Sequence, residues 1–258
     1  MVFSNSENGE PLCWEIARSV AAEYGWDDYL IPPLERTRLT KRELKAFAGR
    51  YLLDADNVLT VDRRGDRLWA HETLTEPFEL VPVSATRFVR REGDPQWDFE
   101  APKGEISPGV NVGRRGSTSP PSRAPRAVDP IPTEDIAAGR VAEGLAALGA
   151  LRVQASGEPA LARDRLEDRG RTLLRHGSAR AAQALLVFAS GIHPGSAAIH
   201  DAMTEAHLAL RQFDAAARSA RAVIETVDTD PEPTASWRVV YRTRALERLA
   251  MLARRTAE

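Results

Sequence analysis

The chain has 258 residues, of which 43% are hydrophobic and 28% are charged, a composition close to that of folded globular domains. Its length predicts between one and two domains, and its composition excludes wholesale disorder and a collagen-like repeat. The formal net charge of −2 excludes the broad basic field of a nucleic-acid-binding protein. No apolar run reaches the length of about 18 residues that predicts a membrane span.

Cys13 is the single cysteine, so neither an internal disulfide nor a Cys-x-x-Cys metal site is expected. The residues after Met1 lack the basic segment that opens a signal peptide. Nothing else in the sequence indicates a compartment, so the localisation stays open.

The first 30 residues predict a strand followed by one amphipathic helix. Met1–Asn5 has the apolar character of the end of a buried strand. Apolar residues then recur at every fourth position up to Gly25, which predicts a helix with one apolar face. A lone strand and a single helix cannot bury their own apolar surfaces, so we expect both to belong to a larger domain. The apolar stripe consists of Leu12, Ile16, Val20 and Tyr24.

Residues 31–128 have the pattern of a small antiparallel β-barrel. Thr40 and Glu43 form a capping-box sequence, which predicts a short helix up to Gly49. Segments rich in strand-forming residues follow at intervals of roughly ten residues, separated by turn residues. Such a meander favours a barrel or a sandwich. The expected strands lie at 57–61, 67–70, 78–83, 86–89 and 97–100.

Residues 113–126 are rich in glycine, serine, proline and arginine. Because this composition buries little apolar surface, we expect a flexible Pro/Ser/Arg-rich loop or linker at the end of the barrel. The arginines of the segment offer contact with an anionic surface as an alternative, and a solvated linker is the simpler interpretation. Few contacts are then expected between the barrel and the following region.

Residues 129–258 are rich in alanine, leucine and arginine with helical spacing, and they predict an all-α array. Aligning 166–194 with 200–228 places similar residues 34 positions apart, and each unit has the pattern of two helices joined by a polar turn. A period of 34 residues is typical of the tetratricopeptide repeat. Residues 133–151 and 234–254 are expected to form an opening and a closing helix. The matched positions include Leu174 with Leu208 and Ala182 with Ala216.

The order of these parts resembles the C-terminal part of penicillin-binding-protein-like serine hydrolases, the relatives of class C β-lactamases. Val2-Phe3-Ser4-Asn5, the amphipathic helix and Glu23-Tyr24-Gly25-Trp26 are similar to the end of their catalytic domain. Gly49-Arg50-Tyr51 and residues 80–88 are similar to the lipocalin-like barrel appended to many members. Residues 166–174 are similar to the tetratricopeptide tail that some members carry.

The resemblance covers residues 1 to about 252, except Asn111–Asp129. It implies an α+β multidomain chain with a small antiparallel lipocalin-like β-barrel followed by an all-α tetratricopeptide-like helical array. Residues 1–30 would be the terminal strand and helix of a serine-hydrolase domain, residues 31–128 the barrel, and residues 129–258 the helical repeats.

The sequence departs from that family at its catalytic motifs. The family uses a serine activated by a lysine three residues later, a Tyr-x-Asn and a Lys-Thr-Gly or His-x-Gly strand. No lysine here has a serine three positions before it, and no Tyr-x-Asn exists. His193-Pro194-Gly195 has the His-x-Gly pattern but falls between two repeats. Because the catalytic elements precede the strand at Val2 in the family, the resemblance implies a chain truncated past the active site.

Other chemistry has no support in the sequence, so we expect no catalytic residue, cofactor or metal site. No Walker loop, Gly-x-Ser-x-Gly, His-Glu-x-x-His or dinucleotide-binding motif is present. The histidines at 193, 200 and 207 are spaced seven apart, about 10 Å along a helix, which is too far for one metal ion. Trp69, Trp97 and Phe99 either line a barrel pocket for an apolar ligand or form a plain aromatic core, and the core is the simpler interpretation.

Two functions remain open. The first is a non-catalytic accessory and interaction region of a serine β-lactamase-like hydrolase, and the second is a free-standing adaptor whose repeats bind a peptide or protein partner. The missing motifs disfavour a third, an active enzyme as the chain stands. In the repeats, the alternative to a partner groove is a solvated polar face. The groove-facing positions are Arg171, Arg175, Asp201 and Glu205.

Overall fold

A computed structural model describes residues 9–26, 35–90, 95–113, 119–127, 129–154 and 157–255. The chain divides into two compact units, Met1–Arg38 and Leu39–Glu258. In the first unit, helix α1 spans Gly9–Tyr24, as predicted, and its apolar residues Ile16, Val20 and Tyr24 are exposed. The strand predicted at Met1–Asn5 lies outside the described residues.

The second unit begins with the predicted short helix, α2 (Lys41–Phe47). The Thr40 hydroxyl accepts a hydrogen bond from the Glu43 backbone nitrogen (3.2 Å), and the Glu43 carboxylate accepts one from the Thr40 nitrogen (2.7 Å). This reciprocal pair satisfies backbone donors that have no partner within the first helical turn. The helix buries Leu44 and Phe47 against the interior of the sheet that follows.

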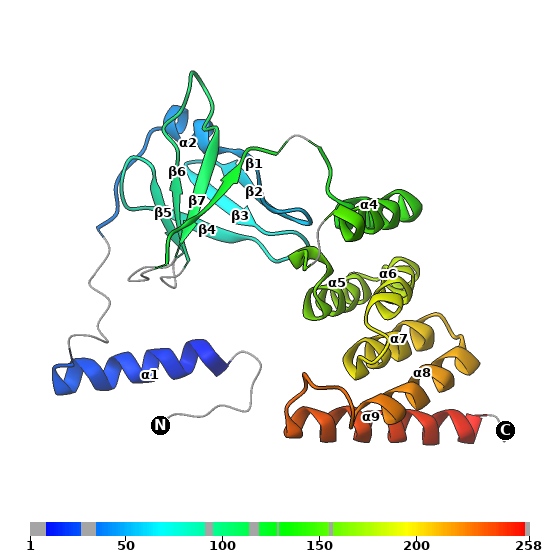
Figure 1. The fold of residues 1–258 in the computed structure, drawn as a ribbon. Helices are drawn as coiled ribbons and strands as arrows, with labels where there is room; N and C mark the ends of the chain where they lie inside the picture. Colours follow the sequence, from blue (N-terminus) through cyan, green and yellow to red (C-terminus); the bar gives the residue numbers. More distant parts are fainter. Residues whose placement is uncertain are drawn as a thin grey trace. The chain divides into compact units, whose positions relative to one another are not determined.

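Eight strands form one antiparallel sheet in which each strand pairs with its neighbour in the chain (Figure 1). The last strand returns to the first: the Ala127 nitrogen donates to the Arg50 carbonyl (2.8 Å), and Tyr51 bridges to Arg126. The sheet is therefore a nearly closed up-and-down barrel, and the chain as a whole has the predicted α+β composition. Its strands are β1 (Gly49–Asp54), β2 (Asn57–Arg64), β3 (Arg67–His71), β4 (Phe78–Pro82), β5 (Arg87–Arg90), β6 (Gln96–Phe99), β7 (Gly109–Gly113) and β8 (Ser122–Pro125).

Aromatic side chains fill the interior of the barrel. The rings of Phe47, Phe88 and Phe99 lie 5.1–5.3 Å apart, and the Tyr51 hydroxyl donates to the Phe47 carbonyl (2.7 Å). Trp97 and Phe99 are buried in this cluster, which confirms the core interpretation for both. Trp69 lies outside the cluster, where the Arg64 guanidinium stands 5.3 Å from its ring centre.

The segment predicted as a linker, 113–126, belongs in part to the barrel, which corrects the sequence prediction. Gly113 ends β7, and Ser122–Pro125 forms the closing strand β8. The Arg126 guanidinium donates to the carbonyls of Ala48 (2.7 Å) and Ser107 (3.2 Å). It therefore connects the end of β8 to the segments that precede β1 and β7. By lying against β1, β8 pairs backbone groups at that edge of the sheet. This segment therefore forms a strand although its residues have low strand propensity.

After β8 the described residues are mainly helical, and consecutive helices from α5 to α9 pack against each other (Figure 1). Arg163 and Ala197, which open α5 and α7, are 34 residues apart, as are Ala179 and Phe213, which open α6 and α8. The helices are α3 (Pro132–Ala137), α4 (Val141–Gln154), the 3-10 turn η2 (Pro159–Leu161), α5 (Arg163–Arg175), α6 (Ala179–Ile192), α7 (Ala197–Ala209), α8 (Phe213–Thr226) and α9 (Ala235–Arg255).

The predicted closing helix is therefore present as α9, whereas the predicted opening helix over 133–151 is two helices. Gly139 lies between α3 and α4 with a φ of +87°, a conformation that glycine adopts without strain. Within the described parts of the chain, no helix has the length and apolar character to cross a membrane, in agreement with the sequence.

The packing of the repeats depends on small residues. A Cβ atom on Gly170 would lie 2.5 Å from Leu186 Cδ2, so a larger residue at this position of α5 requires the Leu186 side chain on α6 to move. Thirty-four residues later, the equivalent positions are Thr204 and Ala220, so the first helix carries a larger residue and the second a smaller one. The predicted small positions Ala182 and Ala216 are both fully buried.

A buried polar junction joins the barrel to the helices, where the sequence had predicted few contacts. The carboxylate of Asp56, in the β1–β2 turn, accepts hydrogen bonds from the nitrogen (2.7 Å) and hydroxyl (2.5 Å) of Thr133 on α3. Arg169 on α5 donates to the Thr73 carbonyl and to Asn57 Oδ1 (3.1 Å). All five residues of this junction, Asp56, Thr133, Thr73, Asn57 and Arg169, are buried. Barrel and array thus form one compact unit rather than two independent parts.

Leu74 adds an apolar contact to this junction. It lies between β3 and β4 with a φ of +61° and packs against the hydrophobic cluster of the helical array. A branched side chain in this left-handed region is strained by roughly 1–3 kcal/mol, and such strain persists only where surrounding contacts offset it. The insertion of Leu74 into the array supplies those contacts.

Candidate functional site

Three of the four predicted groove residues meet in one ionic cluster on the helical array. Arg171 on α5 donates to Asp201 Oδ2 (2.9 Å) and to Glu205 Oε2 (2.9 Å) on α7. Asp201 and Glu205 are four residues apart and therefore lie on the same helix face. The fourth residue, Arg175, does not join them: its side chain is 63% exposed and donates to the Thr172 hydroxyl (2.6 Å).

A residue that the sequence analysis did not single out completes the cluster. Arg248 on α9 donates to both carboxylates, at 2.5 Å from Asp201 and 2.6 Å from Glu205. Arg244, one helical turn earlier, lies 3.8 Å from Asp201. Arg244 and Arg248 are four residues apart, as are Asp201 and Glu205. This matched spacing is the feature of the sequence that could have predicted the pairing.

Burial makes this cluster a packed element of the array. The Asp201 side chain is fully buried, and those of Arg171 and Arg248 are 19% and 18% exposed. Burial alone would lower the pKa of Arg171, but the surrounding carboxylates, led by Glu205, outweigh it and raise that pKa above its ordinary value. Burial also raises the pKa of the neighbouring Tyr241 hydroxyl, with a further contribution from Glu167. Every charge at the centre of the cluster thus has a partner inside the chain.

The three spaced histidines have separate partners. His193 Nε2 lies 2.8 Å from the Leu161 carbonyl, and His200 Nε2 lies 2.9 Å from that of Pro194. His207 is buried and meets the Ser219 hydroxyl at 3.1 Å; burial lowers its pKa, and the Arg218 charge lowers it further. Across the described ranges, no group of three or more His, Cys, Asp or Glu residues is arranged to hold a metal ion.

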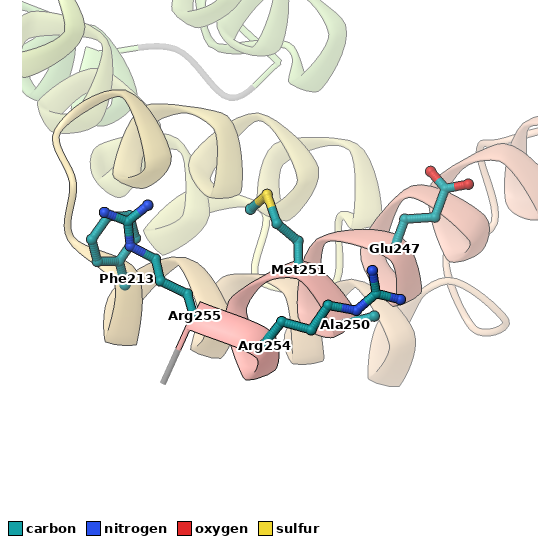
Figure 2. A pocket seen from close by; sticks show the side chains of 6 residues that line it. All are labelled: Phe213, Glu247, Ala250, Met251, Arg254 and Arg255. Atoms are coloured by element: carbon teal, nitrogen blue, oxygen red, sulfur yellow. The ribbon is translucent and has the colours of Figure 1, made fainter. Parts of the chain in front are cut away.

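A pocket of about 460 Å³ lies at the other end of the array, between the start of α8 and the last turns of α9 (Figure 2). The Arg255 guanidinium stands 4.3 Å from the ring centre of Phe213, and Met251 is 49% exposed. Three of its lining residues are apolar and three are charged. We call it the α9 edge pocket; its lining residues are Phe213, Glu247, Ala250, Met251, Arg254 and Arg255.

Comparison with known proteins gives no match for this chain, either to a family model or to a curated sequence.

Proposed function

We propose that this chain is a non-catalytic interaction region, in which a tetratricopeptide-like helical array binds a protein or peptide partner. The observation that carries the proposal is the recurrence of the helix pair α5–α6 as α7–α8 with the same bounds 34 residues later. Stacked helix pairs of this period form extended surfaces whose use in proteins is the recognition of other chains.

The barrel is assigned a supporting role. Eight strands in up-and-down order are the arrangement of lipocalin-like barrels, which enclose ligands where their interior is hollow. Here aromatic residues occupy the interior, and the Asp56–Thr133 and Arg169 contacts fasten one end to the array. A filled, fastened barrel favours a scaffold over a carrier of small molecules.

The first version of this proposal is an accessory region of a serine β-lactamase-like hydrolase. The order of parts supports it: a helix in a compact unit of its own, then the barrel, then the repeats. The exposed Ile16, Val20 and Tyr24 on α1 are the apolar face that a catalytic domain would cover. The alternative is a free-standing adaptor that uses the array alone.

The proposal is tested on the intact chain. A display library of random peptides is selected against it, and hydrogen exchange then locates each selected peptide. Protection of amides within 163–255 is expected; protection confined to the barrel strands, or selection of no peptide, would contradict the interaction role.

A parallel assay tests the absence of catalysis. The chain should hydrolyse neither a chromogenic β-lactam nor a p-nitrophenyl ester above the blank, and a fluorophosphonate probe should label no serine. Stoichiometric labelling of one serine would overturn the non-catalytic assignment. The reading frame upstream of Met1 separates the two versions: Ser-x-x-Lys and Tyr-x-Asn encoded there favour the hydrolase, and their absence favours the adaptor.

A further inference from the structure

Helix α9 carries six arginines and one acidic residue, Glu247. Four of the arginines are engaged within the array: Arg238 donates to the Asp230 carbonyl (2.8 Å), Arg242 pairs with Asp228, and Arg244 and Arg248 reach Asp201. The remaining two, Arg254 and Arg255, are exposed and form no ion pair with any described residue. These two arginines lie at the C-terminal end of the helix.

Apolar surface lies directly beside this charge. Met251 on α9 is 49% exposed, and the Arg255 guanidinium stands 4.3 Å from the ring centre of Phe213. Figure 2 shows the Arg255 side chain of α9 reaching Phe213 of α8, and Met251 projecting from α9. Methionine is flexible and polarisable, so it adapts to side chains of different shapes.

The repeat pattern explains why this surface is open. Helix α5 packs against the following helix α6, and α7 packs in the same way against α8. Helix α9 occupies the place of the next first helix, and no helix follows it among the described residues. In the described chain, Met251 on α9 is therefore left 49% exposed at the pocket.

We propose that the α9 edge pocket docks an acidic amphipathic helix of a protein partner. This inference rests on the proposed interaction function and names the partner class and the surface. An apolar side chain of the partner would enter beside Met251, while its carboxylates would pair with Arg254 and Arg255, a charge-assisted contact favoured at a desolvated rim.

Charge selects this occupant over a second copy of the chain. Two α9 ends face to face would bring together four arginines without an ion pair among the described residues, Arg254 and Arg255 of each copy, and like charges across an interface disfavour that contact. The lining by Phe213, Ala250 and Met251 distinguishes the pocket from a phosphate-binding groove, which is lined by basic and polar groups. The ionic cluster around Asp201 does not compete for the partner, because its charges are already paired.

The test uses the intact chain and fluorescein-labelled helical peptides, with binding measured by anisotropy. One peptide has leucines on one face and glutamates along its edges, and its matched control replaces every glutamate with glutamine. The acidic peptide should bind at least about tenfold more tightly than the control, and added salt should weaken it. The double variant Arg254→Glu/Arg255→Glu should lose about tenfold or more in affinity, and Met251→Glu should also weaken binding.

A matched variant controls for net charge. Arg180→Glu/Arg221→Glu changes two exposed arginines on α6 and α8 by the same charge and should leave the affinity unchanged. Equal loss in both double variants, equal binding of both peptides, or tighter binding of single-stranded DNA would overturn the proposal. If Arg254→Glu/Arg255→Glu has no effect while library-selected peptides protect α5 and α7, this inference fails and the interaction function stands.

Discussion

Arg169 and Arg171 lie two residues apart on α5 and join the helix to different neighbours. Two residues correspond to about 200° around a helix, so the two side chains leave it on opposite faces. Arg169 points to the barrel, where its acceptors are two carbonyl oxygens and an amide oxygen. Arg171 points to α7, where its acceptors are the carboxylates of Asp201 and Glu205, and it also pairs with Glu167 on α5.

The two interfaces differ in how completely the buried charge is satisfied. Arg169 is buried with no hydrogen-bond partner for its Nε, and burial lowers its pKa. Arg171 has a carboxylate at each side, and its pKa is raised. A buried guanidinium whose acceptors are neutral, such as that of Arg169, is costly to bury, and removing it is expected to destabilise the fold strongly. Removing a partly exposed guanidinium that is paired with carboxylates, such as that of Arg171, is expected to cost less stability. The barrel junction should therefore be the more sensitive interface.

The largest effect is expected from removing Arg169. Arg169→Leu removes the guanidinium donor from the buried Thr73 and Asp56 carbonyls, takes one of two donors from Asn57 Oδ1, and should cost about 3–5 kcal/mol in the free energy of unfolding. Arg171→Leu should cost about 1–3 kcal/mol, because water reaches part of its cluster. Urea titration followed by circular dichroism measures both.

Arg175→Leu is the control for helix propensity and charge, since its side chain is mostly exposed. It should change stability by less than about 0.5 kcal/mol. Equal losses in the Arg169 and Arg171 variants would remove the distinction between the interfaces.

The next effect concerns Gly170, which lies between the two arginines. Gly170→Thr places atoms against Leu186 and should cost up to about 3 kcal/mol by overpacking. Adding Leu186→Ala reproduces the Thr–Ala pair of the following repeat, so the double variant should cost at least about 1 kcal/mol less than the sum of the singles.

The control for this cycle is Gly191→Ala on α6, where nothing lies within 4 Å of the added Cβ. It should be neutral or stabilising by up to about 1 kcal/mol. Strict additivity of the two changes at 170 and 186 would contradict the close approach of α5 and α6.

A pH dependence is expected from Asp56. Burial raises the pKa of its carboxyl to about 6, while the hydrogen bonds from Thr133 and the Arg169 charge oppose the shift. Between about pH 6 and the ordinary aspartate pKa near 4, the Asp56 carboxyl is protonated in the folded chain but ionised in the unfolded chain. The free energy of unfolding therefore rises by about 2–3 kcal/mol as the pH falls through that window.

Asp56→Asn isolates that contribution, because its amide keeps a hydrogen-bond acceptor for the Thr133 nitrogen. The variant should lack the rise in stability between pH 6 and 4. His207 acts in the opposite direction, since its lowered pKa makes stability fall as the pH drops through the ordinary histidine range near 6.5. The difference between wild type and variant at each pH cancels the His207 contribution. Identical profiles would contradict the burial of Asp56 as a charged group.

The smallest effect is expected at Ser219. Ser219→Ala leaves His207 Nδ1 without its partner in a buried site and should cost about 1 kcal/mol. Ser190→Ala, which removes a local hydrogen bond to the Val187 carbonyl in the same helix, should cost less. A larger loss at Ser190 would show that the buried pair contributes little.

The sequence predicted the features that depend on local pattern. Thr40 and Glu43 are three residues apart and specify a helix start by themselves, and the 34-residue period located α5 to α8. Asp201 and Glu205 could be placed on one face by helical spacing alone. Their proposed use as a partner groove stays a prediction.

The features that were missed depend on contacts between distant segments. Asp56 and Thr133 are 77 residues apart, and Arg169 and Thr73 are 96 apart. No periodicity relates such positions, because a buried polar contact depends on the final arrangement of both segments. The strand β8 was missed for the same reason, since its pairing with β7 and its contact with β1, rather than its own propensity, make it a strand.

Differential scanning calorimetry of the intact chain tests most directly whether the barrel and the array are one cooperative structure. The junction predicts a single main transition for residues 39–258 in the wild type, with the calorimetric enthalpy equal to the van't Hoff enthalpy. Arg169→Leu should split that transition into two. Two separate transitions in the wild type, assigned to barrel and helices by hydrogen exchange, would contradict the coupling and restore independent halves.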